Sequence, residues 1–161
     1  MAASEVPAGF NLTALNGDTR PVEEWTITFQ LLVVVLDPYT YESSWLLGTA
    51  GRILETFRGA SVRIGFVVTA DETDTRRFLG PWADEMMVFV DGDRSFVKAC
   101  ELSELPALCH VRQTRQLLVA EGWQPPEWKA IVNGVAIERH WTQPLVPGPG
   151  DPAPYVGSPA T

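Results

Sequence analysis

Cysteine and histidine are scarce in this sequence, which has two of each among 161 residues. Two sulfurs are too few for the disulfide framework of a small secreted domain. The eight-residue gap between Cys100 and Cys109 matches no recognised metal-binding or redox pattern. We therefore expect neither a metal ion nor a cofactor.

Positive charge is also in short supply, with 12 Lys and Arg against 20 Asp and Glu and a net charge of −8. An acidic chain has no general field that draws it to nucleic acid or to an anionic membrane surface. No apolar run reaches the roughly 18 residues that cross a bilayer, and residues 1–7 lack the basic start and apolar stretch of a secretory signal. We expect a cytoplasmic protein whose partner is neither nucleic acid nor a membrane.

The length and the apolar share of 45% favour one buried core. We assign residues 10–142 to a single domain and residues 1–9 to an N-terminal segment. Residues 143–161 contain six of the thirteen prolines and almost no charge, a composition that forms no regular structure by itself. We favour a mobile tail there. The alternative is an extended strap that docks through three apolar side chains, Leu145, Val146 and Tyr155.

Apolar runs and helix-spaced apolar positions alternate along the chain. Residues 31–36 are a continuous run of Val and Leu, typical of a strand that is covered on both faces. Asp37-Pro38 ends this run, because proline cannot donate to a sheet. Further strands are expected at 62–68, 86–90, 106–111 and 116–120. Helices are expected at 44–57, 71–79 and 93–100, and from residue 125 onwards.

Two features of the sequence concern the ends of these elements. Asn16-Gly17 predicts the turn of an N-terminal hairpin, with Val22 and Trp25 on its returning strand. Ser43 or Ser44 is expected to cap the helix that begins there, since a serine hydroxyl accepts from the free amides of a first helical turn.

The order of elements predicts an α/β fold, with a mixed central sheet, helices on both faces, an N-terminal hairpin and a Pro-rich C-terminal tail. Three stretches of this order stand out: Phe10-x-Leu12-x-x-Leu15-x-Gly17, residues 32–36 and residues 99–108. Through them the chain resembles the thioredoxin-like superfamily, and within it the redoxin branch of membrane-tethered thiol reductases and peroxiredoxins. The resemblance spans roughly residues 10–139 and implies a cis peptide bond between Leu105 and Pro106.

The resemblance also implies an active site whose sulfur this chain lacks. In the family, a Cys-x-x-Cys pair or a single peroxidatic cysteine opens the helix after the first central strand, where the helix N-terminus lowers the thiol pKa. Here that stretch is residues 37–45, and the register places Tyr41 and Ser44 where the two sulfurs would be. A serine without a general base cannot replace a thiolate. Ordinary thioredoxin or peroxiredoxin catalysis at this loop is therefore excluded.

Cys100 and Cys109 are the remaining redox candidates. Unpaired cysteine is among the most buried residue types, so two inert, buried side chains are favoured over a non-standard dithiol. We expect Cys100 at a helix end and Cys109 inside a strand, neither of them at a helix N-terminus. His110 follows Cys109, but neighbours on a strand point to opposite faces, so we expect no activated pair.

Aromatic side chains gather where the active site would be. In the family, a groove between this loop and the cis-proline holds an extended segment of the partner protein, and the loss of sulfur need not remove the groove. Tyr and Trp supply the stiff contact area that is enriched at interfaces. An equal alternative puts Trp45 in the core and lets the tyrosines cover the helix start. The candidate protein-binding groove consists of Tyr39, Thr40, Tyr41, Glu42, Ser43, Ser44, Trp45, Leu105 and Pro106.

These observations lead to one functional prediction and two alternatives. We expect a non-catalytic protein-binding module, either chaperone-like or a subunit of an assembly, whose protein partner the sequence does not name. The first alternative is a thiol oxidoreductase or antioxidant protein that uses Cys100 and Cys109 in a non-standard way. The second is a structural homo-oligomer in which residues 143–161 strap onto a neighbouring copy.

Overall fold

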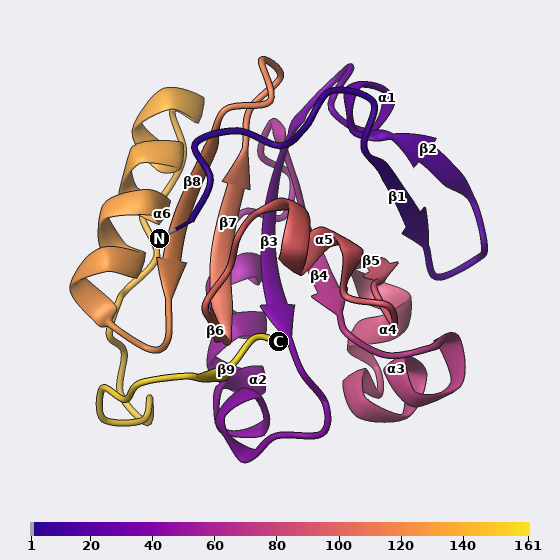
Figure 1. Cartoon of the computed structure of the whole chain (residues 1–161). Coiled ribbons are helices and arrows are strands. Elements are labelled where there is room, and N and C mark those ends of the chain that lie inside the picture. Colours follow the sequence, from indigo (N-terminus) through magenta and orange to yellow (C-terminus); the bar gives the residue numbers. More distant parts are fainter. Residues whose placement is uncertain (1) are drawn as a thin grey trace.

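A mixed seven-stranded sheet forms the centre of the protein in the computed structural model, which describes residues 2–161. The strands lie in the order β2-β1-β5-β4-β3-β7-β8, with helices on both faces (Figure 1). They are β1 (Asn11–Ala14), β2 (Thr19–Pro21), β3 (Gln30–Leu36), β4 (Val62–Val68), β5 (Met87–Val90), β7 (Ala107–Val111) and β8 (Leu117–Glu121). A second, two-stranded sheet pairs β6 (Glu104–Leu105) with β9 (Ser158–Pro159). The predicted α/β fold class is confirmed.

Six helices connect or flank these strands among the described residues. They are α1 (Val22–Trp25), α2 (Tyr41–Glu55), α3 (Glu72–Leu79), α4 (Trp82–Glu85), α5 (Ser95–Ala99) and α6 (Pro125–Arg139). The one-turn helix α4 was not among the helices expected from the sequence. Pro81 precedes it directly, and proline suits the start of a helix. None of the helices within residues 2–161 combines the length and apolar character that spanning a bilayer requires.

The strand β3 occupies the middle of the sheet because both of its faces are apolar. Every residue from Leu31 to Leu36 is buried. β3 pairs in parallel with β4 and antiparallel with β7, so Val33 lies between Gly65 and Cys109. Parallel neighbours need a crossover, which α2 supplies between β3 and β4. The loop that follows β3 is thereby placed at the end of the sheet where α2 begins.

The N-terminal hairpin is present but shorter than expected. β1 and β2 pair antiparallel on either side of Gly17, whose φ is +91°. Val22 and Trp25 lie in α1 instead of on the returning strand, so that part of the prediction was wrong. The reason is Pro21, which cannot continue the sheet and suits the residue before a first helical turn. Both side chains are buried, and Trp25 Nε1 donates to the Leu12 carbonyl at 3.0 Å.

The helix α2 starts at Tyr41, upstream of the predicted start, and neither serine caps it. Thr40 is the N-cap residue, and its side chain accepts no hydrogen bond from the first turn. The buried Ser43 hydroxyl accepts from the Asp37 amide at 2.9 Å, while the Ser44 hydroxyl donates to the Thr40 carbonyl at 3.2 Å. The capping prediction was wrong because the helix extends into the loop, where both hydroxyls bond to the turn between β3 and α2.

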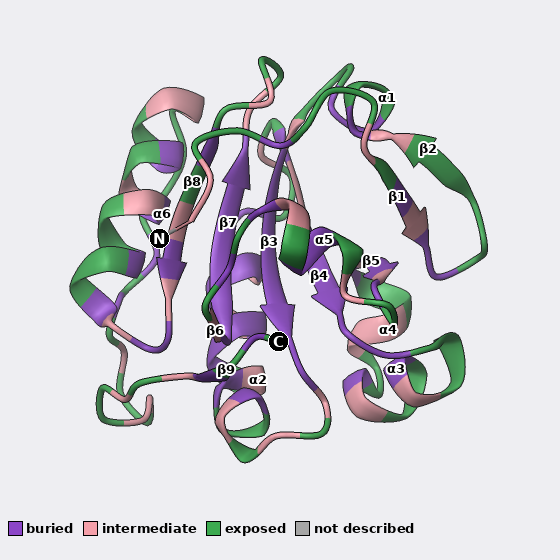
Figure 2. Cartoon of the chain, viewed as in Figure 1, coloured by how far each residue is buried: buried purple, intermediate pink, exposed green. Residues whose placement is uncertain are grey.

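Two hydrophobic clusters cover the two faces of the sheet, and the central strands β3 and β7 between them are buried (Figure 2). α2 and α6 pack on one face through residues such as Ile53 and Trp128. α1 and α5 pack on the other face through residues such as Trp25 and Phe96. Because side chains alternate along a strand, β7 places Cys109 in the second cluster, on the face opposite α2.

Residues 143–161 lie along the domain as an extended segment, so the mobile tail that we favoured was wrong and the strap describes them (Figure 1). Trp123 and Tyr155 form an antiparallel bridge, and further along β9 pairs with β6. Val146 is buried and Tyr155 is half-buried, whereas Leu145 is exposed. Backbone pairing with distant residues, which composition does not reveal, holds this segment in place.

We predict that Gly65→Ala lowers the free energy of unfolding by about 2–3 kcal/mol. A Cβ at Gly65 in β4 would lie 2.0 Å from the Met87 carbonyl oxygen of β5, which is backbone within the sheet. The control is Gly134→Ala in α6, where a Cβ meets nothing within 4 Å. That change should stabilise the protein by about 0.5–1 kcal/mol. Urea unfolding measures both effects, and equal midpoints for the two variants would contradict the prediction.

Candidate functional site

The loop after β3 is held in shape by the side chain of Asp37. This carboxylate is buried directly beyond the end of β3. Its Oδ1 accepts from the Tyr39 amide at 3.0 Å, which tightens the turn, and its Oδ2 lies 2.7 Å from Arg94 Nη2. A buried carboxylate needs an opposite charge to offset its lost hydration. The Asp37–Arg94 ion pair therefore fixes where the chain turns into α2.

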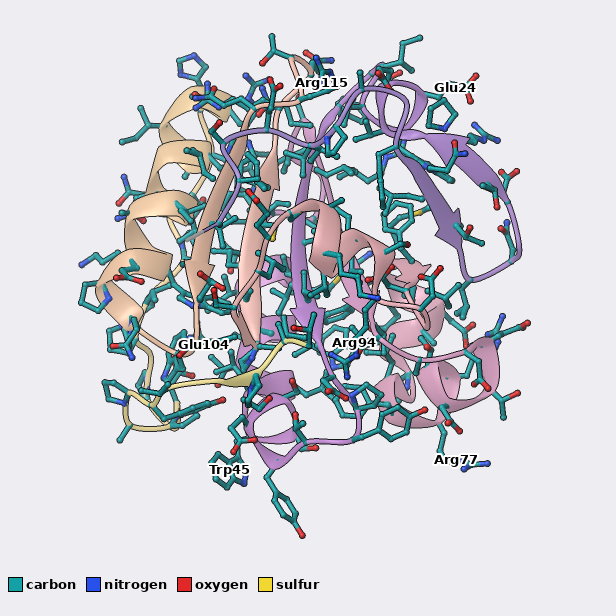
Figure 3. All side chains as sticks on the ribbon, viewed as in Figure 1. Glu24, Trp45, Arg77, Arg94, Glu104 and Arg115 are labelled. Carbon is teal, nitrogen blue, oxygen red and sulfur yellow. The ribbon has the colours of Figure 1, made fainter. Side chains whose placement is uncertain are left out.

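Arg94 connects this loop to two other parts of the chain. It directly precedes α5, with a left-handed backbone at φ +59°. Its Nη1 also donates to the Ala160 carbonyl, near the end of the C-terminal segment. Figure 3 shows Arg94 beside the yellow ribbon of that segment. The loop, the start of α5 and the C-terminal segment thus share one guanidinium group.

Three aromatic side chains, Tyr41, Trp45 and Tyr155, form what we call the aromatic ridge. Tyr41 and Trp45 are one turn apart on α2 and stack with ring centroids 6.3 Å apart. They are 78% and 58% exposed, and Figure 3 shows Trp45 pointing away from the ribbon. Tyr155 meets Trp45 edge-on at 5.6 Å, and its hydroxyl donates to the Glu42 carbonyl at 2.5 Å. The alternative that put Trp45 in the core was wrong.

Tyr39 points toward α3 and is not part of the ridge. Its hydroxyl donates to Asp74 Oδ2 at 2.5 Å, and this bond to a carboxylate raises the pKa of Tyr39 to about 12. A cavity of about 370 Å³ lies between the loop and α3, lined by Pro38, Tyr39, Asp74, Arg77 and Phe78. Tyr39 is therefore anchored by its hydroxyl, although its ring remains open to solvent.

The hydroxyl groups of the predicted groove bond to the local backbone. The Thr40 hydroxyl donates to the Asp37 carbonyl at 3.0 Å, and Glu42 accepts from Tyr155 through its own carbonyl. Ser43 and Ser44 hold the turn as described above. Within residues 2–161, no three His, Cys, Asp or Glu side chains are grouped so as to hold a metal ion.

Leu105 and Pro106, the other part of the predicted groove, are both buried. The peptide bond between them is cis. β9 pairs with β6 so that Ser158 lies opposite Leu105. The structure therefore does not join Leu105 and Pro106 to the aromatic ridge in one open groove, because residues 157–160 lie along that edge.

Cys100 and Cys109 are free thiols, buried on the sheet face opposite α2. Cys100 follows the last residue of α5 and Cys109 lies in β7, as predicted. Burial raises the pKa of Cys100 to about 12, and it raises the pKa of Cys109 well above its ordinary value. Since the thiolate is the reacting species, neither sulfur is activated. The geometry does not favour the oxidoreductase alternative.

His110 faces away from Cys109, toward α6. Its Nε2 lies 2.7 Å from Gln30 Oε1, to which the ring donates. Burial lowers the pKa of His110 to about 4, with a smaller contribution from the nearby Arg112. The imidazole is therefore neutral at pH 7 and takes part in packing, not in activating a thiol.

Two residues of the site escaped sequence reasoning. Arg94 lies near the start of the helix expected at residues 93–100, and nothing in the sequence shows its left-handed backbone. The available signal was Asp37, a carboxylate directly after an apolar strand, which requires a cationic partner. Tyr155 was considered as a docking residue, but its place in the ridge depends on the path of the C-terminal segment.

Comparisons with solved structures show that this chain has the thioredoxin-like fold. It is similar to the thioredoxin domain of a thiol-disulfide oxidoreductase from Bacteroides vulgatus, with a TM-score of 0.62, 15% identity and coverage of 84% of this chain and 97% of that one. It is also similar to the exposed lipoprotein thioredoxin of Streptococcus pneumoniae, with a TM-score of 0.60, 15% identity and coverage of 80% of this chain and 98% of that one. A hypothetical protein from Sinorhizobium meliloti is similar with a TM-score of 0.61 and 13% identity, and the match covers 98% of this chain and 94% of that one. No family model and no curated protein matches the sequence.

We predict that neither native thiol reacts with a disulfide reagent such as 5,5′-dithiobis(2-nitrobenzoate) at pH 8 while the protein is folded. Both sulfurs are buried and have raised pKa values, so almost no accessible thiolate exists. Absorbance measured in buffer and then in guanidinium should show both thiols only after unfolding. Rapid modification of the folded protein would contradict this prediction.

We also predict that His110 makes the protein less stable in acid. Its pKa is about 4 in the folded protein, against an ordinary value of 6.5, so between these values the unfolded chain binds more protons. Stability is complete above pH 6.5 and falls as the pH drops toward 4, by up to about 3 kcal/mol from this group. Urea unfolding across this range should show a flatter profile for His110→Gln than for wild type. Identical profiles would assign the acid sensitivity to other groups.

Proposed function

We propose that this protein is a non-catalytic, thioredoxin-fold module that binds a protein partner through the aromatic ridge. The observation that carries the proposal is the stacked Tyr41–Trp45 pair, which is exposed at the start of α2. Sequence register puts Tyr41 at the first position of the missing cysteine motif. An exposed aromatic ring therefore lies where a redox relative would present its first sulfur, and Trp45 stacks against that ring.

The ridge has the physical properties of a binding surface. Tyr and Trp bury about 150–250 Å² each when covered, and they dominate the energetics of many interfaces. The rings are already ordered by mutual stacking and by Tyr155, which packs against Trp45 and is tied to the Glu42 carbonyl. Ordering before association reduces the conformational entropy that binding must remove.

The thiols support this proposal more than they support a redox role. Cys100 and Cys109 lie on the opposite face of the sheet from α2, and their burial disfavours the thiolate. Several similar structures are thiol-disulfide oxidoreductases or thioredoxins, but sequence identities near 15% are evidence for a shared fold and not for a shared activity. A cytoplasmic location remains a prediction from the sequence.

The proposal is tested by placing a photo-crosslinking amino acid, benzoylphenylalanine, at Gly48. This residue is one turn beyond Trp45 on α2, is exposed, and has open space for a side chain. In cells that produce the protein, we expect light to yield a discrete adduct with a partner. Adding Trp45→Ala should reduce that adduct at least about tenfold, as expected for an interface hot spot. The purified protein should not reduce insulin at the rate of a thioredoxin.

The matched control places the same amino acid at Gly134, which is also exposed, unobstructed and inside a 15-residue helix. It should give no such adduct. The proposal fails if both positions give the same adducts, or if the adduct survives Trp45→Ala combined with Tyr41→Ala. It also fails if insulin is reduced efficiently.

A further inference from the structure

The edge of β6 is paired with the chain's own C-terminal segment in the manner of a bound peptide. Ser158 lies opposite Leu105, and its hydroxyl donates to the Leu105 carbonyl at 3.2 Å. The Ala160 amide donates to the Ser103 carbonyl at 3.0 Å. Figure 1 shows β9 running alongside β6. Addition of an extended strand to a sheet edge is a common mode of peptide recognition.

Close packing restricts two positions of this segment to small residues. A Cβ at Gly157 would lie 2.6 Å from the Leu105 carbonyl oxygen, although the backbone there is not left-handed. Glycine is thus required by close approach to β6 and not by its own conformation. Three residues later, Ala160 is 1% exposed within the second hydrophobic cluster. The edge therefore accepts a glycine and, three residues on, a small apolar side chain.

The occupied edge lies next to the aromatic ridge. Tyr155, the third member of the ridge, precedes Gly157 by two residues and is tied to Trp123 by backbone hydrogen bonds in both directions. At the other end, Arg94 donates to the Ala160 carbonyl while it holds Asp37 in the loop before α2. A partner that covers the ridge would therefore lie beside the β6 edge.

The segment can leave β6 without losing its upstream anchors. Asp151 accepts from Thr49 at 2.9 Å and from Arg52 at 2.7 Å. The Trp123–Tyr155 bridge holds the chain up to residue 155. Neither contact involves β6, so residues 157–161 can swing away while residues 151–155 stay in place.

We propose that residues 157–160 are a built-in ligand of the β6 edge, which a partner replaces with its own extended segment carrying glycine and, three residues later, a small apolar side chain. This inference rests on the proposed binding function, because it concerns how the partner gains access to the same region. A tethered ligand has an effective concentration in the millimolar range, so it competes strongly with an external peptide. If the edge is free in about 1% of molecules, an external peptide binds about 100-fold more weakly than to a free edge.

The test uses a fluorescent peptide with the sequence of residues 155–161 and the full-length protein. Gly157→Val should expel the segment, because its Cβ would meet the Leu105 carbonyl. We expect fluorescence anisotropy to show at least about tenfold tighter peptide binding to Gly157→Val than to wild type. The control protein is Val156→Ala, a change at an exposed neighbour that should leave binding at the wild-type level. A peptide carrying Gly157→Val should not bind to any of the proteins.

A second variant, Ala160→Asp, guards against an effect peculiar to position 157. Burying a carboxylate is costly, so it should also release the segment and tighten peptide binding. Hydrogen exchange at the amides of residues 157–160 reports the release, and circular dichroism reports the fold. The inference is overturned if both variants release the segment yet bind the peptide no better than wild type, or if neither releases it. If the peptide binds to the released variants but Gly48 gives no crosslink, the β6 edge site is supported and the aromatic ridge is rejected as the partner site. Failure of this inference can therefore be distinguished from failure of the proposed function.

Discussion

The ion pair between the buried Asp37 and the partly exposed Arg94 is the interaction on which the rest of the site depends. A carboxylate at the end of the central strand loses its hydration on folding, and only a charged partner with good geometry offsets that cost. Arg94 supplies it from the turn before α5 and also donates to the Ala160 carbonyl. The start of α2, and with it the display of the aromatic rings, is therefore set by a residue from another part of the chain.

The sequence predicted those features of the fold that depend on local pattern. The run at residues 31–36 became β3 because an uninterrupted apolar run is stable only when covered on both faces. Composition could not predict the path of residues 143–161, because the Trp123–Tyr155 bridge joins distant residues. The serines were misassigned for a related reason: a hydroxyl that can cap a helix can also bond within a turn, and tertiary context decides between these roles.

For the candidate site, the sequence shows directly that thioredoxin-type thiol chemistry is missing. It does not show which side chains of the site are exposed. The absence of cysteine from residues 37–45 can be read directly. The exposure of Trp45 could not be predicted, since a tryptophan at helical spacing can lie in a core or on a surface. In this same protein, Trp128 lies in a helix and is buried in the core. The pairing of Ser158 with Leu105 could not be predicted either, because it depends on the register of β9 on β6.

The burial of both native thiols has a practical consequence. Sulfhydryl reagents that cannot enter the folded interior should pass over Cys100 and Cys109. A single cysteine engineered on the surface would then be the sole reactive handle on the molecule. Dyes, spin labels or immobilisation linkers could be attached at a chosen position without first removing the natural cysteines.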